Sequence, residues 1–588
     1  MPSFKKSKNS NPAKKHSIAT RAQGTTFSTI LSTIYYYTLG ALFSNISNSV
    51  YSLVGSLGMA RWARDIVRIV PSKPGVVKLR SSLGSGGAKA GKGNKNLTEW
   101  INASVPSLTE RFTPAAWLPN GHLQTLFTAA GDFTKVDKVH YIRTYLRLPD
   151  GGTLGIDATP ENHHGLPVDA PTVVVCHGLT GGSHESYVRN ILAWVTKPKE
   201  DGGLGGRGVV VNFRGCAGVP VTSCQLYSAG TTMDLALALH FIRNRHPSSP
   251  LIGIGFSLGA SVISRYLGEY GSSSILSAGV VLGCPWDLTA MSHKLENDWF
   301  TARVYSSTLG RNVLRLFFKA YDQNPAVFEV LDSPIREYIE ELKAERKNQG
   351  TRSRLRRIDD LLVSKIGGPR GIGAWPFPSA KEYYDWASPT HVLRGVRVPL
   401  FAINAFDDPV VDGGMAFCQT VRHELRANPV TFSIGALPLD EFVASSHIYT
   451  AVTGGGGHLG WFDGPFFDKT KSKQRWVLKP VSEFISACTR DLSPPDEDPD
   501  SGVDVVAGSR IGPKGADTKQ GAEANGNADI KPNIDANVEA NADGGWEWVV
   551  NPKYKIPGLE KLGWKVLREG EVVEGESDEG EGGLVQGL

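Results

Sequence analysis

The chain has 588 residues, of which 40% are hydrophobic and 21% are charged, and its formal net charge at pH 7 is +5. This composition indicates a globular protein with enough apolar residues for a large core, and the length is usual for roughly two to four domains. Because the net charge is small and no basic run alternates with aromatic residues, the sequence disfavours nucleic-acid binding. The cysteines are scattered without Cys-x-x-Cys pairs, which disfavours a disulfide framework or a zinc site and favours a reducing compartment. They are Cys176, Cys216, Cys224, Cys284, Cys418 and Cys488.

Residues 1–103 are predicted to form a basic N-terminal extension. Every charged residue before Asp65 is a lysine or an arginine, and residues 22–60 carry no charge. This stretch is long enough to span a bilayer, although its Ser, Thr, Asn and Gly content makes it a weak spanning helix. A membrane anchor or interfacial helix, an organelle-targeting segment and a disordered or packed extension all remain open. We favour membrane association through residues 25–60, with the catalytic domain in a reducing, cytosolic compartment and the membrane left open.

A flexible linker is predicted at residues 81–96, SSLGSGGAKAGKGNKN. Gly86 to Lys92 fit the first seven positions of a phosphate-binding loop, G-x-x-x-x-G-K, but Gly93 stands where Ser or Thr is required. No apolar strand precedes the loop either. We therefore predict no nucleotide site here.

Residues 104–490 have the pattern of one α/β domain. HYIRTYLRLPDGGTLGIDAT predicts two strands joined by a Gly-Gly turn, and PTVVVCHG, GVVVNFRG, LIGIGFS, AGVVLGC and VPLFAINAF are continuous apolar runs. Such runs are typical of parallel strands buried on both faces, and helical patterns lie between several of them. We expect a mostly parallel central sheet flanked by helices. The interval at about 286–390 interrupts the alternation and predicts an inserted helical lid.

Residues 491–588 are predicted to be a low-complexity, disordered tail, because segments such as DLSPPDEDPDSG are acidic and contain few apolar residues. A short apolar island, WEWVVNPKYKIPGLEKLGWKVL, lies within it at about 546–568. The sequence assigns no role to this island.

Ser257 is the candidate nucleophile. It stands in Gly-x-Ser-x-Gly, a pattern that chance can supply in a chain with 66 glycines. Here, however, an apolar strand precedes the serine and a helix of small residues follows it, which is the context of a nucleophile elbow. The glycines at 255 and 259 permit the sharp turn that such an elbow needs. An ordinary structural turn is the alternative.

Backbone N–H donors for an oxyanion are expected beside this serine. His177-Gly178-Leu179-Thr180-Gly181 follows a predicted strand, where the N–H of Leu179 can supply one donor and that of Leu258 the other. A glycine-rich loop without a ligand is the alternative. We expect His177 to shape this loop and not to act as the base.

The acid and the base are expected after later strands. Asp408, followed by proline, is preferred as the acid that orients the base, with Asp407 as the alternative and Asp412 as a solvated turn residue. His458 follows four glycines after the last predicted strand, a position that packing hardly explains, and is the candidate base. The order Ser257, Asp408, His458 matches that of hydrolases with this geometry.

Six segments together resemble the EMB8-like branch of the α/β-hydrolase superfamily, which includes YheT-type esterases, abhydrolase-domain lipid hydrolases and yeast medium-chain ethyl ester synthase/esterases. They are WLPNGHLQT, HGLTGGSHESYVRN, NFRGCAGVP, GFSLGA, NAFDDPV and GGHLGWF. The resemblance covers roughly residues 104–490 and implies the α/β-hydrolase fold. It implies that Ser257, Asp408 and His458 form the catalytic triad of a serine esterase or lipase that needs no cofactor or metal.

The resemblance implies hydrolysis of short- to medium-chain acyl esters, including monoacylglycerols. Acyl transfer to an alcohol on the same triad is the alternative, and a non-catalytic scaffold or thioester or amide cleavage are further ones. Some members are discussed as acyltransferases through H-x-x-x-x-D, which occurs here as His164 to Asp169, His293 to Asp298 and His458 to Asp463. Because two fixed residues recur by chance, we assign no separate site to them. The expected partners are a small-molecule ester or lipid and a membrane surface.

Overall fold

The computed structural model describes residues 66–79, 94–347, 353–369, 375–411, 437–492, 545–550, 561–568 and 571. The predicted membrane segment at 25–60, the G-x-x-x-x-G-K stretch, Asp412 and most of the low-complexity tail lie outside these residues. In the part of the chain that is described, no helix has both the length and the apolar character to cross a membrane.

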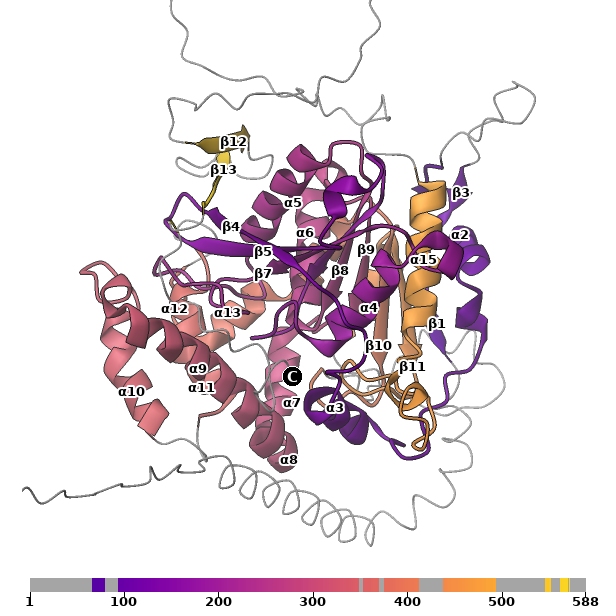
Figure 1. Ribbon diagram of the computed structural model, residues 1–588. Coiled ribbons are helices and arrows are strands. Elements are labelled where there is room, and N and C mark those ends of the chain that lie inside the picture. The colour runs from indigo at the N-terminus through magenta and orange to yellow at the C-terminus, as the bar shows by residue number, and fades with distance from the viewer. Residues whose placement is uncertain are drawn as a thin grey trace, which may run out of the picture. The chain divides into compact units, whose positions relative to one another are not determined.

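A sheet of eleven strands organises the described residues, in the order β1-β11-β10-β9-β8-β6-β7-β5-β4-β13-β12 (Figure 1). The strands are β1 Val67–Ile69, β4 Ile142–Arg147, β5 Thr153–Thr159, β6 Thr172–Cys176, β7 Arg207–Asn212, β8 Leu251–Phe256, β9 Ala278–Leu282, β10 Leu400–Ala405, β11 Ile448–Thr453, β12 Trp546–Val550 and β13 Lys561–Val566. A two-stranded sheet pairs β2 Val76–Val77 with β3 Lys95–Asn96. Strands β7, β6, β8, β9, β10 and β11 are mutually parallel, and the remaining pairs of the large sheet are antiparallel.

The predicted sheet is confirmed in its central strands. The five apolar runs form β6, β7, β8, β9 and β10, and every residue of these strands is buried. Continuous apolar character is needed because helices cover both faces of the sheet, so neither row of side chains meets water. The fold class is therefore the predicted one, a mostly parallel sheet flanked by helices.

The helices are α2 Leu97–Ser104, α3 Gly121–Ala130, α4 Ser186–Thr196, α5 Met233–Arg245, α6 Leu258–Tyr270, α7 Leu288–Asn297, α8 Trp299–Thr301, α9 Ser307–Gln323, α10 Ile339–Lys347, α11 Leu355–Ile358, α12 Ser364–Ile366, α13 Ala380–Ala387, α14 Leu439–Ala444 and α15 Leu478–Asp491. Two π-helical turns are η5 Ala302–Ser306 and η8 Asp359–Val363. Short 3₁₀ turns are η1 Pro106–Thr109, η2 His163–Gly165, η3 Lys199–Asp201, η4 Gly271–Ser273, η6 Pro325–Val327, η7 Arg336–Tyr338, η9 Pro389–Gly395 and η11 Lys471–Lys473.

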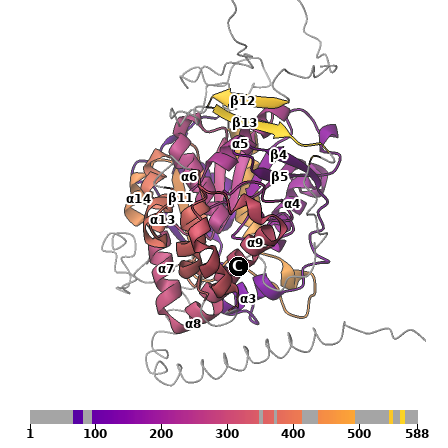
Figure 2. The same cartoon turned by 90° about the vertical axis from the view of Figure 1, so that its left-hand side faces the viewer.

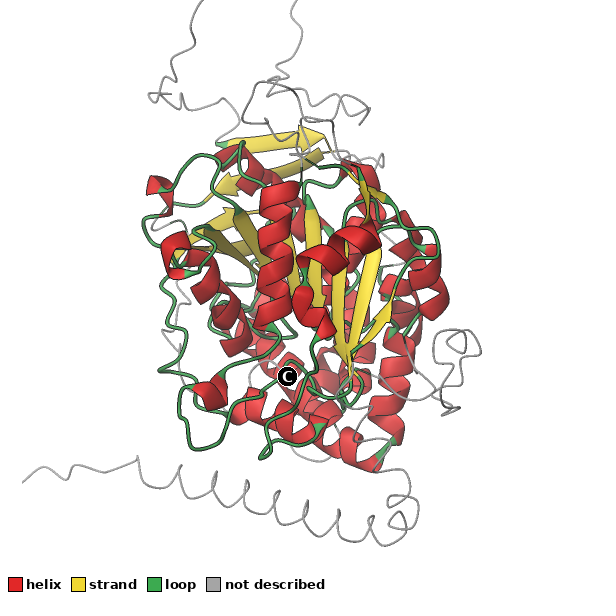
Figure 3. Cartoon of the chain, turned by 90° about the vertical axis from the view of Figure 1, so that its right-hand side faces the viewer, coloured by secondary structure: helices red, strands yellow, loops and turns green. Residues whose placement is uncertain are grey.

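Two apolar clusters hold these helices on the sheet. Side chains of α5, α6 and α14 pack on one face, around residues such as Val174 and Val211. Side chains of α2, α4 and α15 pack on the other face, around Val175 and Ile254, and these helices stand in front of the strands in Figure 3. Alternate residues of one strand thus enter different clusters, as the period of two in a strand requires.

The interval between β9 and β10 forms helices α7 to α13, as the sequence predicts for an inserted helical segment (Figure 2). It has an apolar cluster of its own, with Phe317, Phe328 and Leu362 fully or almost fully buried. The same cluster includes Leu258 and Leu179 as partly buried neighbours. The insertion therefore packs directly on the loops at the carboxyl ends of β6 and β8.

Both ends of the described chain add strands outside the interval 104–490. Strand β1 pairs with β11, and α2 packs with α15, so the sheet begins before residue 104. The apolar island supplies β12 and β13, and β13 pairs with β4 through Lys565 and Val566. Leu562 and Trp564 are buried in the cluster that includes α5. The island thus belongs to the sheet, a role that the sequence alone did not assign.

Candidate active site

Ser257 lies in a sharp turn between β8 and α6, with φ +53° and ψ −118°. The neighbouring glycines make this turn sterically feasible. A Cβ at Gly255 would lie 2.4 Å from the carbonyl oxygen of Gly259, and a Cβ at Gly259 would lie 2.2 Å from that of Cys176. Because both contacts are with backbone atoms, a larger residue at either position would force the main chain to move. The predicted strand-turn-helix context of Ser257 is therefore present.

Three side chains from separate strand ends meet in one hydrogen-bonded row. The Ser257 hydroxyl lies 2.8 Å from Nε2 of His458, and Nδ1 of His458 lies 2.7 Å from Oδ2 of Asp408. His458 and Asp408 are each 1% exposed, and Ser257 is 7% exposed. With Nδ1–H donating to the carboxylate, Nε2 is left to accept the proton of the serine. This arrangement can deprotonate a hydroxyl for nucleophilic attack.

The two adjacent acids Asp407 and Asp408 have different partners. Oδ1 of Asp408 accepts hydrogen bonds from the N–H groups of Val410 and Val411, at 2.8 and 2.9 Å, which fixes its carboxylate toward His458. Oδ1 of Asp407 accepts from the N–H of Gly457 at 2.9 Å. Asp407 thus binds the loop that carries His458, whereas Asp408 contacts the imidazole itself. Burial raises the pKa of Asp407 to about 6.

Helix α3 also holds the loop that carries His458. The His458 N–H donates to Oγ1 of Thr125 at 2.8 Å, and the Phe462 N–H donates to Oε1 of Gln124 at 2.8 Å. Gln124 in turn donates through Nε2 to the carbonyl oxygens of Leu118 and Phe462. These residues belong to the WLPNGHLQT segment, which the sequence analysis used only as a mark of resemblance. The available signal in the sequence was the pair of polar residues Gln124 and Thr125 between Leu123 and Leu126.

The loop after β6 lies against Ser257. A Cβ at Gly178 would stand 3.6 Å from Cβ of Ser257, which brings the neighbouring N–H of Leu179 close to the serine. Among the described residues, no hydrogen-bond acceptor faces the N–H of Leu179 or that of Leu258. Both amides are therefore available to a ligand at this place.

His177 does not contact this row of side chains. Its Nε2 accepts from the N–H of Phe213 at 3.3 Å, and its Nδ1 lies 2.8 Å from the carbonyl oxygen of Gly178. Burial lowers the pKa of His177 to about 4, so the ring is neutral near pH 7. It joins the loop to the end of β7, in agreement with a shaping role.

The H-x-x-x-x-D pairs do not form histidine-aspartate hydrogen bonds within the described residues. His293 contacts Asn297, Asp298 accepts from the N–H of Thr301, and His458 pairs with Asp408 and not with Asp463. The described part of the chain also contains no group of three or more His, Cys, Asp or Glu side chains arranged to hold a metal ion.

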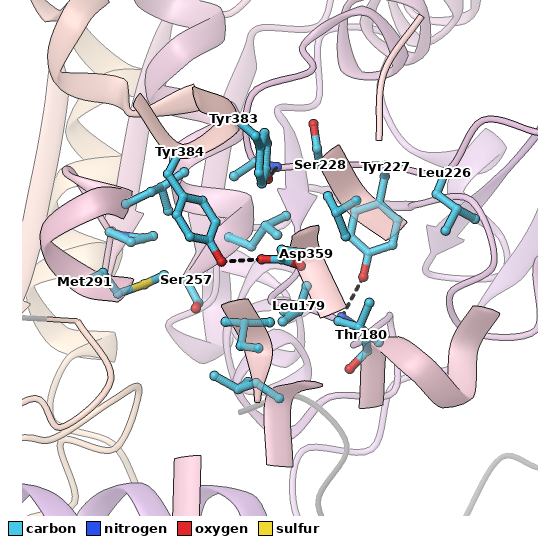
Figure 4. A pocket seen from close by; sticks show the side chains of 18 of the residues that line it. Leu179, Thr180, Leu226, Tyr227, Ser228, Ser257, Met291, Asp359, Tyr383 and Tyr384 are labelled. Atoms are coloured by element: carbon cyan, nitrogen blue, oxygen red, sulfur yellow. Dashed lines mark hydrogen bonds between the residues drawn. The ribbon is translucent and has the colours of Figure 1, made fainter. Parts of the chain in front are cut away.

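A cavity opens beside Ser257 (Figure 4). Its wall is largely apolar and combines the loops that follow β6 and β8 with the inserted helices. The apolar side chains are Leu179, Leu226, Leu258, Leu288, Met291, Leu309, Val313, Leu316, Leu355, Val363 and Val410. The nucleophile candidate therefore faces a space suited to a hydrocarbon chain.

Comparison with known proteins finds a matching family model and several relatives. A family model described as alpha/beta hydrolase fold matches residues 171–320. A monoacylglycerol lipase of Saccharomyces cerevisiae is 27% identical over 435 residues, covering 67% of this chain and 85% of the relative. Medium-chain fatty acid ethyl ester synthase/esterase 2 of the same yeast is 28% identical over 455 residues, covering 68% and 91%. Embryogenesis-associated protein EMB8 of Picea glauca is 29% identical over 424 residues, covering 70% and 81%. The resemblance stated from the sequence segments is confirmed.

The raised pKa of Asp407 predicts a pH-dependent contribution to stability. The folded chain holds this proton up to about pH 6, whereas the ordinary value is 3.8. The free energy of unfolding contributed by Asp407 therefore falls as the pH rises through this interval, by at most about 3 kcal/mol. Asp407→Asn keeps an acceptor for Gly457 N–H and removes the titration, so between about pH 4 and pH 7 the variant should gain stability relative to the wild type. Urea unfolding at several pH values measures this.

Asp468→Asn, at an exposed carboxyl group, provides the control. Because hydrogen bonds lower the pKa of Asp468, this variant should not gain stability relative to the wild type as the pH rises. Parallel stability curves for Asp407→Asn and the wild type across this interval would show the interpretation to be wrong.

Proposed function

We propose that this chain, an α/β hydrolase of the esterase or lipase type, cleaves short- to medium-chain acyl esters with Ser257 as nucleophile, His458 as base and Asp408 as the acid that orients the base. The observation that carries the proposal is the buried row of hydrogen bonds, 2.8 Å from Ser257 to His458 and 2.7 Å from His458 to Asp408, at the wall of an apolar cavity. Serine acyl transfer requires this combination.

In the proposed acylation step, Oγ of Ser257 attacks the ester carbonyl carbon while its proton passes to Nε2 of His458. Asp408 holds the imidazole in the tautomer that accepts this proton and stabilises the imidazolium that results. When the tetrahedral intermediate collapses, the C–O bond to the alcohol breaks and His458 returns the proton to the departing alcohol oxygen. Water then attacks the acyl-enzyme with the same base, releasing the fatty acid and the serine.

The N–H groups of Leu179 and Leu258 are proposed to bind the oxyanion of the tetrahedral intermediate. Both amides flank Ser257, and neither has an acceptor among the described residues. Leu258 is the first residue of α6, so its N–H also benefits from the positive end of the helix dipole. Donors placed before the reaction stabilise the negative charge without a cost of reorganisation.

The substrate class rests on the cavity and on the relatives. The leucine and valine side chains of the cavity wall favour an acyl chain. Moving such a chain from water into an apolar environment lowers the free energy by about 0.8 kcal/mol per CH₂ group. The printed names of two similar yeast proteins, a monoacylglycerol lipase and a medium-chain ethyl ester synthase/esterase, support medium-chain esters and monoacylglycerols.

Transfer of the acyl group to an alcohol is the second candidate function, and the name of the ethyl ester synthase/esterase favours it. The chemistry differs only in the last step, where an alcohol replaces water. Exclusion of water by the inserted helices would favour this outcome.

We further propose that residues 25–60 attach the protein to a membrane, with the catalytic part in the cytosol. The uncharged apolar composition of this stretch and the basic residues that flank it support the proposal. A membrane-bound position would place the active site near lipid substrates.

Ser257→Ala should lower the rate of octanoate release from p-nitrophenyl octanoate and monooctanoylglycerol by at least about 10³-fold, because no other group replaces the nucleophile. Fluorophosphonate labelling of the wild type should be lost in the same variant. Ser261→Ala is a matched control one turn further along α6, since Ser261 donates to the carbonyl oxygen of Pro285 and does not line the cavity. Full turnover by Ser257→Ala would overturn the assignment, and an inactive wild type would favour a scaffold role.

Adding ethanol to the p-nitrophenyl octanoate assay measures how the octanoyl group is divided between water and ethanol. For a hydrolase, we expect free octanoate to remain the main product, because water reaches the acyl-enzyme at far higher concentration. Gas chromatography of octanoate and ethyl octanoate gives the ratio. Ethyl octanoate as the dominant product would establish the transferase as the better description.

Membrane attachment predicts that the full-length chain sediments with membranes and resists extraction by high salt. A variant that lacks residues 1–60 should move to the supernatant and keep its ester hydrolase activity, since the described sheet begins after this segment. Fractionation with immunoblotting measures both. If both proteins distribute alike, the segment is not the anchor.

A further inference from the structure

A buried carboxyl group shares the cavity with Ser257. Asp359 is the first residue of the π-helical turn η8 in the inserted segment, and its side chain borders the same cavity as Ser257, Leu179 and Tyr384 (Figure 4). Single π-helical turns within helices often occur at functional sites. The mechanism proposed above gives Asp359 no role.

The carboxyl group of Asp359 has one hydrogen-bond partner among the described residues. The hydroxyl of Tyr384, on α13, donates to its Oδ2 at 2.6 Å, and Oδ1 receives no hydrogen bond from a described residue. Asp359 is 6% exposed and Tyr384 is 3% exposed. A carboxyl group in an apolar wall costs free energy unless it is hydrogen-bonded, so a partner for the remaining oxygen is expected from the ligand.

A second polar group of the cavity lacks a partner. Oγ1 of Thr180, next to Leu179, is buried and makes no hydrogen bond with any described residue. Thr180 has φ +56°, which is unusual for a β-branched residue and holds its side chain at the cavity wall. The Oδ1 of Asp359, which has no partner among the described residues, points to a ligand that is not purely hydrocarbon.

We propose that Asp359 and Tyr384 form a binding subsite for a hydroxyl group of the ester substrate. The inference rests on the function proposed above and adds to it a determinant of substrate choice within the same cavity. In this arrangement Tyr384 orients Asp359, and Oδ1 of Asp359 pairs with the substrate hydroxyl.

A neutral hydroxyl fits this environment better than an anionic group. Burial is the main cause that raises the pKa of Asp359 to about 7, and the acidic side chains of Asp360 and Glu296 add to it. An anionic headgroup would therefore meet negative potential. A hydroxyl can donate to the carboxylate or accept from the carboxylic acid, so it can pair with either form of Asp359.

The hydroxyl can belong to either part of an ester. A glyceryl ester carries hydroxyls on its alcohol part, and a hydroxylated fatty acid carries one on its acyl chain. Ethyl octanoate has neither, monooctanoylglycerol has the first and ethyl ω-hydroxyoctanoate has the second. These three esters share a similar chain length and therefore isolate the hydroxyl and its source.

The test compares kcat/KM for these esters in the full-length wild type, in the double variant Asp359→Leu with Tyr384→Phe, and in Asp359→Asn. Replacing both partners by apolar groups leaves no polar atom unpaired, so the double variant is expected to fold. It should lose about 3- to 10-fold in kcat/KM for one of the hydroxyl-bearing esters relative to ethyl octanoate, mainly through KM. Asp359→Asn keeps a hydrogen-bonding side chain, so its kcat/KM for that ester should stay close to the wild-type value.

Asp385→Asn is the matched control, because Asp385 follows Tyr384 on α13, accepts from Thr289 and Lys381 and does not line the cavity. The proposal would be overturned if the ratios of kcat/KM among the three esters were the same in the double variant as in the wild type. If kcat/KM fell equally for all three esters, Asp359 and Tyr384 would only support the packing of the inserted helices. Calorimetric binding of the corresponding non-hydrolysable ethers to Ser257→Ala reports on the subsite without catalysis. Weaker binding of a hydroxyl-bearing ether when Asp359→Leu and Tyr384→Phe are added to Ser257→Ala would support the subsite. Failure of the wild type to cleave any of the three esters would refute the proposed function and not the subsite.

Discussion

The conformation of Ser257, with φ +53° and ψ −118°, is the constraint on which the rest of the site depends. Such a backbone geometry costs on the order of 1–3 kcal/mol and persists only where the surroundings fix it. Here β8 is buried on both faces, the Ser257 N–H donates to the carbonyl oxygen of Leu282, and α6 starts at the next residue. The glycines at 255 and 259 let these elements approach without steric conflict. The buried sheet thereby stabilises a turn that would not form alone.

The histidine side of the site is assembled from segments far apart in the chain. Asp408 aligns the imidazole, Asp407 binds Gly457, and Thr125 binds the backbone of His458 itself. Two adjacent acids thus divide the tasks of orienting a ring and of holding its loop. Because α3 contributes a side-chain clamp, the four glycines at 454–457 do not leave the histidine loosely held. A precise position for Nε2 is what a general base requires.

Most of the sheet and the three central side chains could be predicted from sequence because their signals are local. Apolar runs mark β6 to β10, and Ser257, Asp408 and His458 each follow a strand of the parallel set β8, β10 and β11, whose carboxyl ends meet at one edge. Thr125 could not be assigned, because its partner lies 333 residues away. The place of Asp359 depends on how the inserted helices pack on the sheet, which no local pattern encodes. For the island at about 546–568, no local pattern encodes that its strand β13 pairs with β4.

Strand β13 has a consequence for the solution behaviour of the protein. Without it, β4 would present a row of unpaired N–H and C=O groups, the kind of edge at which separate chains join into extended sheets. Lys565 and Val566 pair with Arg147 and Leu146, so the same molecule covers the carboxyl-terminal end of that row, and Trp564 is buried beside α5. At the opposite end, the three-residue strand β1 shortens the exposed edge of β11. Residues near both ends of the described chain thus provide the two edge strands of the sheet, β1 and β12.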